Sequence, residues 1–335
     1  MNRINQPLRF ERVYLEKIWG GRALSNSPAK GGLGLSLPEG VQVGETWELV
    51  DRADVNSIVA EGVHKGRTLN ELMQMNSKDL LGRLQATPGG RFPLLVKYID
   101  AAAHLSVQVH PDDQTQHLGA DWEAKTEAWV ILGATDEGRI YLGLSEAATE
   151  ADFTAACRAG GQGLEPMLQV FEPEPGQCYF VPGGTIHAIG AGVTLIEVQQ
   201  NSDTTFRVYD WGRVGLDGLP RDIHIDQALA CVDFQTPAPT PVTPSLNPSS
   251  CVLASCPAFR MGVVADELAG DTHKENEPVI LAVVSGAGTL AVAEQTIEIN
   301  TGDVWLLPAA LGLFHVEGRD LRMVEMRGGA QAQIE

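Results

Sequence analysis

The stretch GQCYFVPGGTIH, residues 176–187, decides the fold class. Its glycines provide the positive φ that tight turns require, and the apolar run CYFV is typical of a short buried strand. Pro182 prevents that strand from extending. A histidine placed directly after such a turn, here His187, is expected to face the interior of a β-barrel. This spacing of glycine, proline and histidine is a far more specific signal than a single histidine.

Strand-like segments dominate the rest of the chain, and each ends near Gly, Pro, Asp or Asn. Helical patterns are few: one spans 68–84, where Thr68 and Glu71 form a capping-box pattern, and another runs from Thr149 to near Gly160. We therefore predict a mainly β protein with a barrel or jelly-roll architecture and peripheral helices. The predicted strands are FPLLVKYID (92–100), HLSVQVH (104–110), EAWVILGA (127–134), CYFVP (178–182), VTLIEVQQ (193–200), VILAVVSG (279–286), GTLAVAE (288–294) and DVWLLP (303–308).

Residues 236–250, TPAPTPVTPSLNPSS, are typical of a linker because they are rich in Pro, Ser and Thr. A weak internal repeat lies on both sides of this linker. In 176–187 and again in 302–315, a proline follows a glycine by six residues and a histidine comes after the next turn. We interpret the two stretches as copies of one barrel hairpin. The sequence then predicts an N-terminal domain at 1–235 and a C-terminal domain at 251–335.

The charge balance excludes several classes of partner. The chain has 43 acidic and 24 basic residues and a formal charge of -19, which would repel a nucleic-acid backbone and an anionic membrane surface. No apolar run reaches the about 18 residues of a membrane span. Five cysteines without a CxxC pair, and a start with no apolar signal region, favour reduced thiols in a cytoplasmic protein. An anionic small substrate would need a local cluster of cations.

Four side chains form a candidate set of metal ligands. Gln108 and His110 are two residues apart in SVQVHPDD, so on a strand both point to one face. Taken alone, a Gln-x-His pair is common, and Glu127 is typical of a solvated strand start. Together His110, Glu127 and His187 offer two imidazoles and one carboxylate, with Gln108 as a possible fourth ligand. Such nitrogen and oxygen ligands suit zinc, and three protein ligands leave room for substrate or water. Iron and manganese accept the same ligands, so the chemistry leaves the metal open.

The motif at 176–187 resembles the second cupin motif, although Ala191 stands where that motif often has Asn. The first cupin motif usually has His-x-His closely followed by Glu, whereas here Glu127 lies seventeen residues after His110. This departure is itself informative. It resembles the type I mannose-6-phosphate isomerase (phosphomannose isomerase) family, in its short bacterial form, and the resemblance extends over roughly residues 10–230. The matching segments are WGG (19–21), GETWEL (44–49), FPLLVKYID (92–100), SVQVHPDD (106–113), KTEAWV (125–130), PGGTIHAIG (182–190) and SDTTFRVYDWGR (202–213).

The resemblance implies two cupin-type jelly-roll barrels with a few peripheral helices. The domain at 1–235 would carry the metal site, and the barrel at 251–335 would be degenerate and structural. The implied ligands of one zinc ion per chain are Gln108, His110, Glu127 and His187. The implied catalytic residues are Arg207, Glu197 and Lys125, and the implied substrate-binding residues are Lys97, Trp19 and Ser106.

The activity implied by this family is the interconversion of mannose 6-phosphate and fructose 6-phosphate through a cis-enediol. Glu197 is our candidate for proton transfer, with a zinc-bound water or a histidine as the alternatives. Arg207 and Lys125 would supply positive charge. Without the family, the lysines are equally typical of a surface. Arg207 is expected at or just past the end of the strand that carries Glu197, and without the family it would be a salt-bridged residue. Trp19 and Trp47 are equally typical of a core.

Other functions fit the same barrel. The alternatives are a non-catalytic sugar-binding or sensing cupin, a cupin isomerase that acts on another sugar, and a redox-metal dioxygenase. In the main interpretation the substrate is a small sugar phosphate. We expect no nucleic-acid or membrane partner, and a chain that is a monomer or a homodimer.

Overall fold

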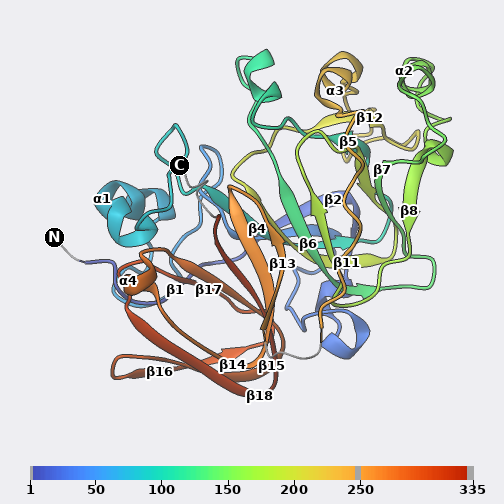
Figure 1. Ribbon diagram of the computed structural model, residues 1–335. Coiled ribbons are helices and arrows are strands. Elements are labelled where there is room, and N and C mark those ends of the chain that lie inside the picture. Colours follow the sequence, from blue (N-terminus) through green and yellow to red (C-terminus); the bar gives the residue numbers. More distant parts are fainter. Residues whose placement is uncertain (1–2, 246–249, 330–335) are drawn as a thin grey trace.

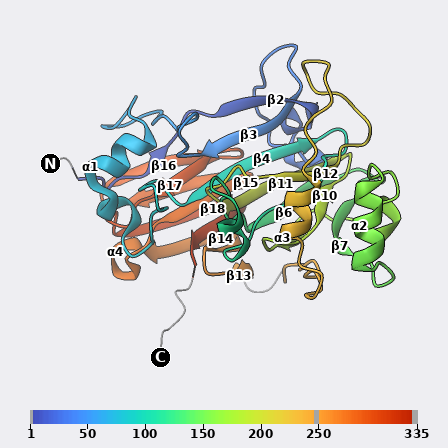
Figure 2. The same cartoon turned by 90° about the horizontal axis from the view of Figure 1, so that it is seen from above.

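The computed structural model describes residues 3–245 and 250–329. In this part of the chain the strands form three antiparallel sheets of six, five and seven strands (Figures 1 and 2). The fold is mainly β, as predicted. None of the helices in the described ranges is long and apolar enough to cross a membrane.

The six-stranded sheet is the middle layer. Its two central strands, β4 and β11, are buried at every position except Gln200. Because side chains on a strand point alternately to the two faces, such strands need cover on both sides. In spatial order the strands are β2 (Val13–Gly21), β3 (Val43–Leu49), β4 (Leu94–Ala101), β11 (Val193–Gln200), β6 (Glu127–Ala134) and β9 (Cys178–Val181).

The five-stranded sheet covers one face of the middle layer. Ile99 and Trp129 of the middle layer share a hydrophobic cluster with Leu142 and Ile189 of this sheet. The helices α2 (Glu150–Arg158) and α3 (Ile225–Cys231) lie beside it (Figure 1). Its strands are β12 (Phe206–Tyr209), β5 (Val107–Val109), β10 (His187–Ile189), β7 (Ile140–Leu144) and β8 (Leu168–Phe171).

The seven-stranded sheet covers the other face. Val96 and Val198 of the middle layer share a core with Met261, Ile280 and Met326 of this sheet. The helices α1 (Leu69–Leu81) and α4 (Thr272–Glu275) lie at this end of the molecule (Figure 1). The strands are β1 (Leu8–Arg9), β17 (Val304–Leu307), β15 (Val279–Val292), β18 (Leu313–Gly328), β14 (Phe259–Asp271) and β13 (Ser250–Ser255), and β16 (Gln295–Asn300) pairs with β15.

Residues from both ends of the chain build this seven-stranded sheet. Leu8 and Arg9 of β1 pair with Leu306 and Trp305 of β17. The predicted linker at 236–250 runs beside β9, where the backbones of Val242 and Cys178 exchange hydrogen bonds of 2.8 and 2.9 Å. Residues 246–249 of that linker, and 330–335 of the predicted C-terminal domain, lie outside the described residues.

Local sequence signals predicted several elements correctly. The predicted strands at 127–134 and 193–200 are confirmed as β6 and β11. The capping box is confirmed, because the Thr68 hydroxyl accepts from Glu71 N at 3.1 Å and the Glu71 carboxylate accepts from Thr68 N at 2.8 Å. The second helix begins at Glu150, directly after Thr149. The described residues also contain four short 3-10 helices: Ala23–Ser25, Pro28–Lys30, Thr115–Leu118 and Glu165–Met167.

Two details of the prediction were wrong. The segments 279–286 and 288–294 form one continuous strand, β15, because glycines allow it to bend between two sets of partners. The repeated stretches are not paired hairpins. Gly176 and Gly302 both have positive φ, 88° and 91°, as the turns require. However, β9 and β10 belong to different sheets, and β17 and β18 lie on opposite sides of β15.

The shared core predicts one cooperative unit. Met261→Ala, in the seven-stranded sheet, should lower the free energy of unfolding by about 2–5 kcal/mol, because a cavity would open against the middle layer. Guanidinium denaturation should show a single transition by fluorescence and by circular dichroism. In the variant, the midpoint of this transition should move to lower denaturant concentration in both signals. The matched control is Val252→Ala on edge strand β13, where the side chain is 66% exposed. Two separate transitions, of which one alone moves, would contradict a shared core.

Candidate active site

One row of side chains crosses the five-stranded sheet. His187 of β10 pairs with Gln108 of β5, and Gln108 pairs in turn with Arg207 of β12. Residues in register on neighbouring strands point to the same face of a sheet. Arg207 therefore shares this face with Gln108 and His187, beyond the end of β11. It is on a strand of its own in the five-stranded sheet, because residues 201–205 cross from β11 to the other layer.

A second row crosses the middle layer. Lys97 of β4 pairs with Trp47 of β3 and with Glu197 of β11, and Glu197 pairs with Trp129 of β6. Lys97, Glu197 and Trp129 line the same small cavity as Gln108 and Arg207 of the facing sheet. The two sheets thus enclose the cavity between them.

Three candidate metal ligands converge in this space. Ligand atoms of His110, Glu127 and His187 all lie within 4.8 Å of one another, and each residue is about 1% exposed. Glu127 Oε1 is 3.4 Å from His187 Nε2, and Glu127 Oε2 is 3.6 Å from His110 Nε2. Two imidazoles and a carboxylate at this spacing suit a divalent transition metal, zinc among them.

Backbone carbonyls fix the orientation of both histidines. His110 Nδ1 donates to Thr204 O at 2.8 Å, and His187 Nδ1 donates to Thr185 O at 2.9 Å. With the proton held on Nδ1, the Nε2 lone pair of each ring points toward Glu127. This arrangement is typical of metal-binding histidines, and it shows that the residues present fit a metal ion.

Gln108 is placed beside these ligands. Its amide is 3.3 Å from His187 Nε2, and its other end accepts a hydrogen bond from the Ser106 hydroxyl at 3.0 Å. The nitrogen and oxygen of an amide are assigned from such contacts. Rotation of the amide group by half a turn would let Gln108 donate to Ser106 and present its oxygen to the metal site.

Burial sets the protonation of the ligands. It lowers the pKa of His187 to about 4, and burial together with the Lys125 charge lowers the pKa of His110 well below its usual value. Both imidazoles are therefore neutral at pH 7, which is the form that binds metals. Burial raises the pKa of Glu127 to about 7, although Lys125 opposes this effect. Lys125 Nζ lies 3.0 Å from Glu127 Oε2 and 3.3 Å from His110 Nε2.

A buried network of charges holds Glu197. Lys97 Nζ lies 3.2 Å from Glu197 Oε1 and 3.7 Å from Glu45 Oε2. The indole N–H of Trp129 donates to Glu197 Oε2 at 3.0 Å. Lys97 also lies over the ring of Trp47, 5.4 Å from its centroid. Burial alone would lower the pKa of Lys97, but its two carboxylate partners raise it above the usual value.

Every predicted catalytic and substrate-binding residue lines the cavity. Sequence reasoning missed further lining residues. Glu45 carried a signal, because a carboxylate stands there between Val43 and Trp47, which lie on the same face of a buried strand. Arg221 lies in a loop without a periodic pattern and carried none. The predicted residues on the lining are Trp19, Lys97, Ser106, Gln108, Lys125, Glu127, Glu197 and Arg207; the missed ones include Lys17, Glu45, Trp129, Asp203, Thr205 and Arg221.

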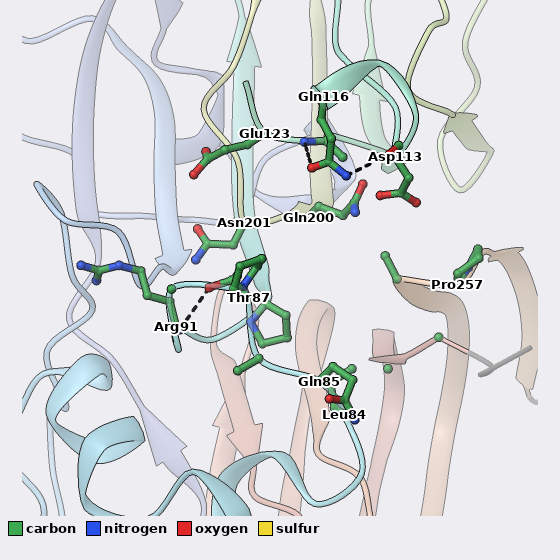
Figure 3. Close-up of a pocket in the computed structure, with 18 of the residues that line it drawn as sticks. Leu84, Gln85, Thr87, Arg91, Asp113, Gln116, Glu123, Gln200, Asn201 and Pro257 are labelled. Carbon is green, nitrogen blue, oxygen red and sulfur yellow. Dashed lines mark hydrogen bonds between the residues drawn. The ribbon is translucent and has the colours of Figure 1, made fainter. Parts of the chain in front are cut away.

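A larger cleft, of about 640 Å³, lies elsewhere. Figure 3 shows Glu123, Gln200 and Asn201 on one wall, with Leu84 and Pro257 across from them. Its arginines are already paired with carboxylates, and the described residues that line it include no group of metal ligands. The chemistry of the side chains, and not the size of the cavity, identifies the candidate active site.

The facing sheets and the buried His–Glu–His cluster define a cupin-type metal-binding protein. A family model for the catalytic domain of type I phosphomannose isomerase matches residues 8–136. Mannose-6-phosphate isomerase ManA of Bacillus subtilis (strain 168) is 34% identical over 322 residues, which cover 93% of this chain and 96% of that protein. The chain belongs to the type I mannose-6-phosphate isomerase family.

Solved structures agree with this assignment. The crystal structure of the mannose 6-phosphate isomerase from Bacillus subtilis has a TM-score of 0.82 and 29% identity, and the match covers 96% of this chain and 99% of that one. A zinc-bound mannose 6-phosphate isomerase has a TM-score of 0.74 and 18% identity, with 97% and 100% of the two chains covered. At that identity the second likeness supports the fold alone.

The charge network predicts a pH-dependent stability. Burial alone would raise the pKa of Glu45, but Lys97, Lys17 and the N–H of Trp47 lower it from 4.5 to about 2. A carboxyl group with a lowered pKa stabilises the fold above its unfolded pKa, and this contribution disappears as the pH falls toward the folded value. Glu45→Gln should therefore be less stable than the wild type by about 3 kcal/mol at pH 7.

The difference in the free energy of unfolding between the wild type and Glu45→Gln should shrink as the pH falls from 4.5 to 2, because the wild type loses the contribution of Glu45. Denaturant unfolding across this range measures it. Glu16→Gln, at an exposed position on β2, is the control and should change little. If the difference for Glu45→Gln stayed constant with pH, the ion pair would not be its cause.

Proposed function

We propose that this chain interconverts mannose 6-phosphate and fructose 6-phosphate. The observation that carries this proposal is the convergence of two imidazole Nε2 atoms and the Glu127 carboxylate beside the buried pair of Glu197 and Lys97. The relatives named mannose-6-phosphate isomerase match along nearly the whole chain. A non-catalytic sugar-binding protein would have no need for a buried carboxylate placed next to candidate metal ligands.

Gln108, His110, Glu127 and His187 would hold one zinc ion. The hydrogen bonds from both Nδ1 atoms, and the neutral imidazoles, support this assignment. When bound, zinc acts as a Lewis acid that polarises sugar oxygens and stabilises the negative charge that develops on them.

Glu197 is our candidate for the proton transfer between C2 and C1. Its side chain is 4% exposed, and Lys97 and the Trp129 N–H keep it oriented into the cavity. As a carboxylate it takes the proton from C2 of the aldose, and the same carboxyl group returns it to C1. In this process the proton of the C2 hydroxyl moves to the oxygen on C1. One base is sufficient because the two carbons are adjacent in a cis-enediol.

Arg207 and Lys125 stabilise the negative charge that appears on the sugar oxygens. Arg207 lies in register with Gln108, directly beside the candidate ligands. Its buried Nε has no hydrogen-bond partner among the described residues, so it is free to donate to substrate. Lys125 reaches the same space from the segment just before β6, and its ammonium contacts Glu127. Lys97, Trp19 and Ser106 are proposed to form the remaining walls of the sugar site.

We assign the metal site to the domain at 1–235 and a structural role to the degenerate barrel at 251–335, beyond the linker at 236–250. His315, the counterpart of His187 in the sequence repeat, is 40% exposed and pairs with Glu267. Five free cysteines support a cytoplasmic location, and the acidic charge argues against nucleic-acid or membrane partners. We expect a monomer or a homodimer.

Metal removal and a coupled assay test the activity. The purified protein should contain about one zinc per chain and form fructose 6-phosphate from mannose 6-phosphate, and exhaustive chelation should abolish the turnover. His187→Ala should lose both zinc and activity, whereas the matched control His315→Ala should keep both. Full activity after chelation, two zinc ions per chain, or a loss of zinc from folded His315→Ala would each refute part of this assignment.

Arg207 should act on turnover. Arg207→Ala removes a preorganised charge and should lower kcat by roughly two to three decades, or about 3–4 kcal/mol, with little change in KM. Arg207→Lys keeps the charge but loses the fork of donors, and it should also be impaired. Steady-state kinetics and a melting curve are measured on the same variants. A lower Tm with near-normal kinetics would remove Arg207 from the catalytic residues.

A further inference from the structure

Arg52 lies outside the cavity that contains the candidate catalytic residues, and it lines the large cleft instead. β3 ends at Leu49, and in the turn that follows Arg52 N donates to Val55 O at 2.9 Å. This turn places the guanidinium beside residues 201–205, which cross from β11 to β12. A cation of the cleft thus contacts backbone that leads to the candidate active site.

One nitrogen of Arg52 joins two segments of the chain. Its Nη1 donates to Glu123 Oε2 at 2.8 Å and to Asn201 O at 2.9 Å. Figure 3 shows both acceptor residues on one wall of the cleft. The Ser202 hydroxyl adds a second link, because it donates to Glu123 O at 3.0 Å. The ion pair with Glu123 is partly exposed and contributes little by itself, so we expect the hydrogen bond to Asn201 to matter more.

The crossing segment orients one candidate metal ligand. Ser202 Oγ also accepts from Thr204 N at 3.2 Å, which fixes the turn between these residues. Thr204 O in turn accepts the Nδ1 proton of His110 at 2.8 Å. A hydrogen bond of this kind fixes the tautomer and the ring orientation of a metal-binding histidine. The position of residues 201–204 therefore sets the direction in which His110 Nε2 points.

The segment before β6 also reaches the candidate ligands. Glu123 precedes Lys125 by two residues, and Lys125 Nζ lies 3.0 Å from Glu127 Oε2 and 3.3 Å from His110 Nε2. Arg52 is thus bonded to both segments that lead to these ligands. A displacement of about 1 Å at a reacting group can cost roughly a hundredfold in rate, even when the substitution that causes it is remote.

We propose that Arg52 is a positioning residue for the candidate metal ligands, and that it acts through the backbone of residues 201–204 and through Glu123. This inference rests on the proposed function and extends the active site to a residue outside the catalytic cavity. The competing role is a purely structural tie, in which Arg52 stabilises the loops and leaves the ligands unaffected.

Arg52→Gln tests the proposal in the whole protein. Its zinc dissociation constant, measured by competition with a chromogenic chelator, should rise roughly tenfold, as for other residues that support a metal ligand from outside. At saturating zinc its kcat for mannose 6-phosphate should fall roughly tenfold, with KM within about threefold of the wild type. Arg52→Lys should restore both values to within about threefold, because one ammonium nitrogen can donate to both acceptors.

Arg83→Gln is the matched control. Arg83 lines the same cleft, and its Nη2 pairs with Glu277 Oε2 at 2.6 Å, where the Glu277 side chain is 2% exposed. Among the residues that the structure describes, Arg83 has no hydrogen bond to Glu123 or to residues 201–205. The loss of its ion pair should lower Tm at least as much as Arg52→Gln does, while zinc affinity and kcat stay within about threefold of the wild type.

A folded Arg52→Gln with the zinc affinity and kcat of the wild type would overturn the proposal, and so would equal changes in Arg83→Gln. If Arg52→Gln fails to fold, Arg52→Met takes its place with the same expected result, because methionine keeps an apolar stem and removes the donors.

A third measurement is independent of zinc and of turnover. If the wild type shows no isomerase activity, the proposed function fails by itself, and NMR on the metal-free proteins still tests Arg52. The Nδ1 proton of His110, which is 1% exposed, should exchange with water about tenfold faster in Arg52→Gln than in the wild type, because local opening controls such exchange. Equal exchange rates in the two proteins would show that Arg52 does not hold the ligand in place.

Discussion

The burial of the middle sheet on both faces is the constraint from which the rest of the structure follows. Alternate side chains of β4 and β11 enter the apolar core shared with the seven-stranded sheet, namely Leu94, Val96, Tyr98, Ile196 and Val198. The alternate positions face the five-stranded sheet, where Ile99 and Leu195 pack and where Lys97 and Glu197 meet. Charged groups persist there because each has an ionic or hydrogen-bonding partner. The alternation of side chains along these strands therefore places the apolar core on one face of the middle sheet and the candidate active-site residues on the other.

The loops between the sheets complete the site. Thr204 lies in the segment that crosses from β11 to β12, and Thr185 lies in the turn before β10. Their carbonyl groups hold the two histidines, so the orientation of the imidazoles depends on backbone that belongs to neither sheet. Side-chain substitution at these two threonines leaves the carbonyls in place. The ligand geometry is in this way protected from many changes in sequence.

The sequence was informative where function requires a local pattern. The turn before His187 and the Gln-x-His pair are short motifs whose spacing fixes the direction of the side chains, so their convergence on Glu127 was predictable. The layer that carries Arg207 was not predictable, because nothing local shows that the chain changes sheets after β11. Arg221 was not found, because its approach to the cavity depends on an ion pair with Asp210 at the base of a hairpin. Such contacts between loops leave no periodic signal.

The pairing of β1 with β17 affects how the chain can fold during synthesis. Leu8 and Arg9 leave the ribosome long before their partners Leu306 and Trp305. The apolar face of the middle sheet stays uncovered until β14, β15 and β18 have emerged. Until then the nascent chain exposes this hydrophobic surface, and such surfaces make partly folded chains prone to aggregation. Native packing becomes complete only when β1 and β17 meet.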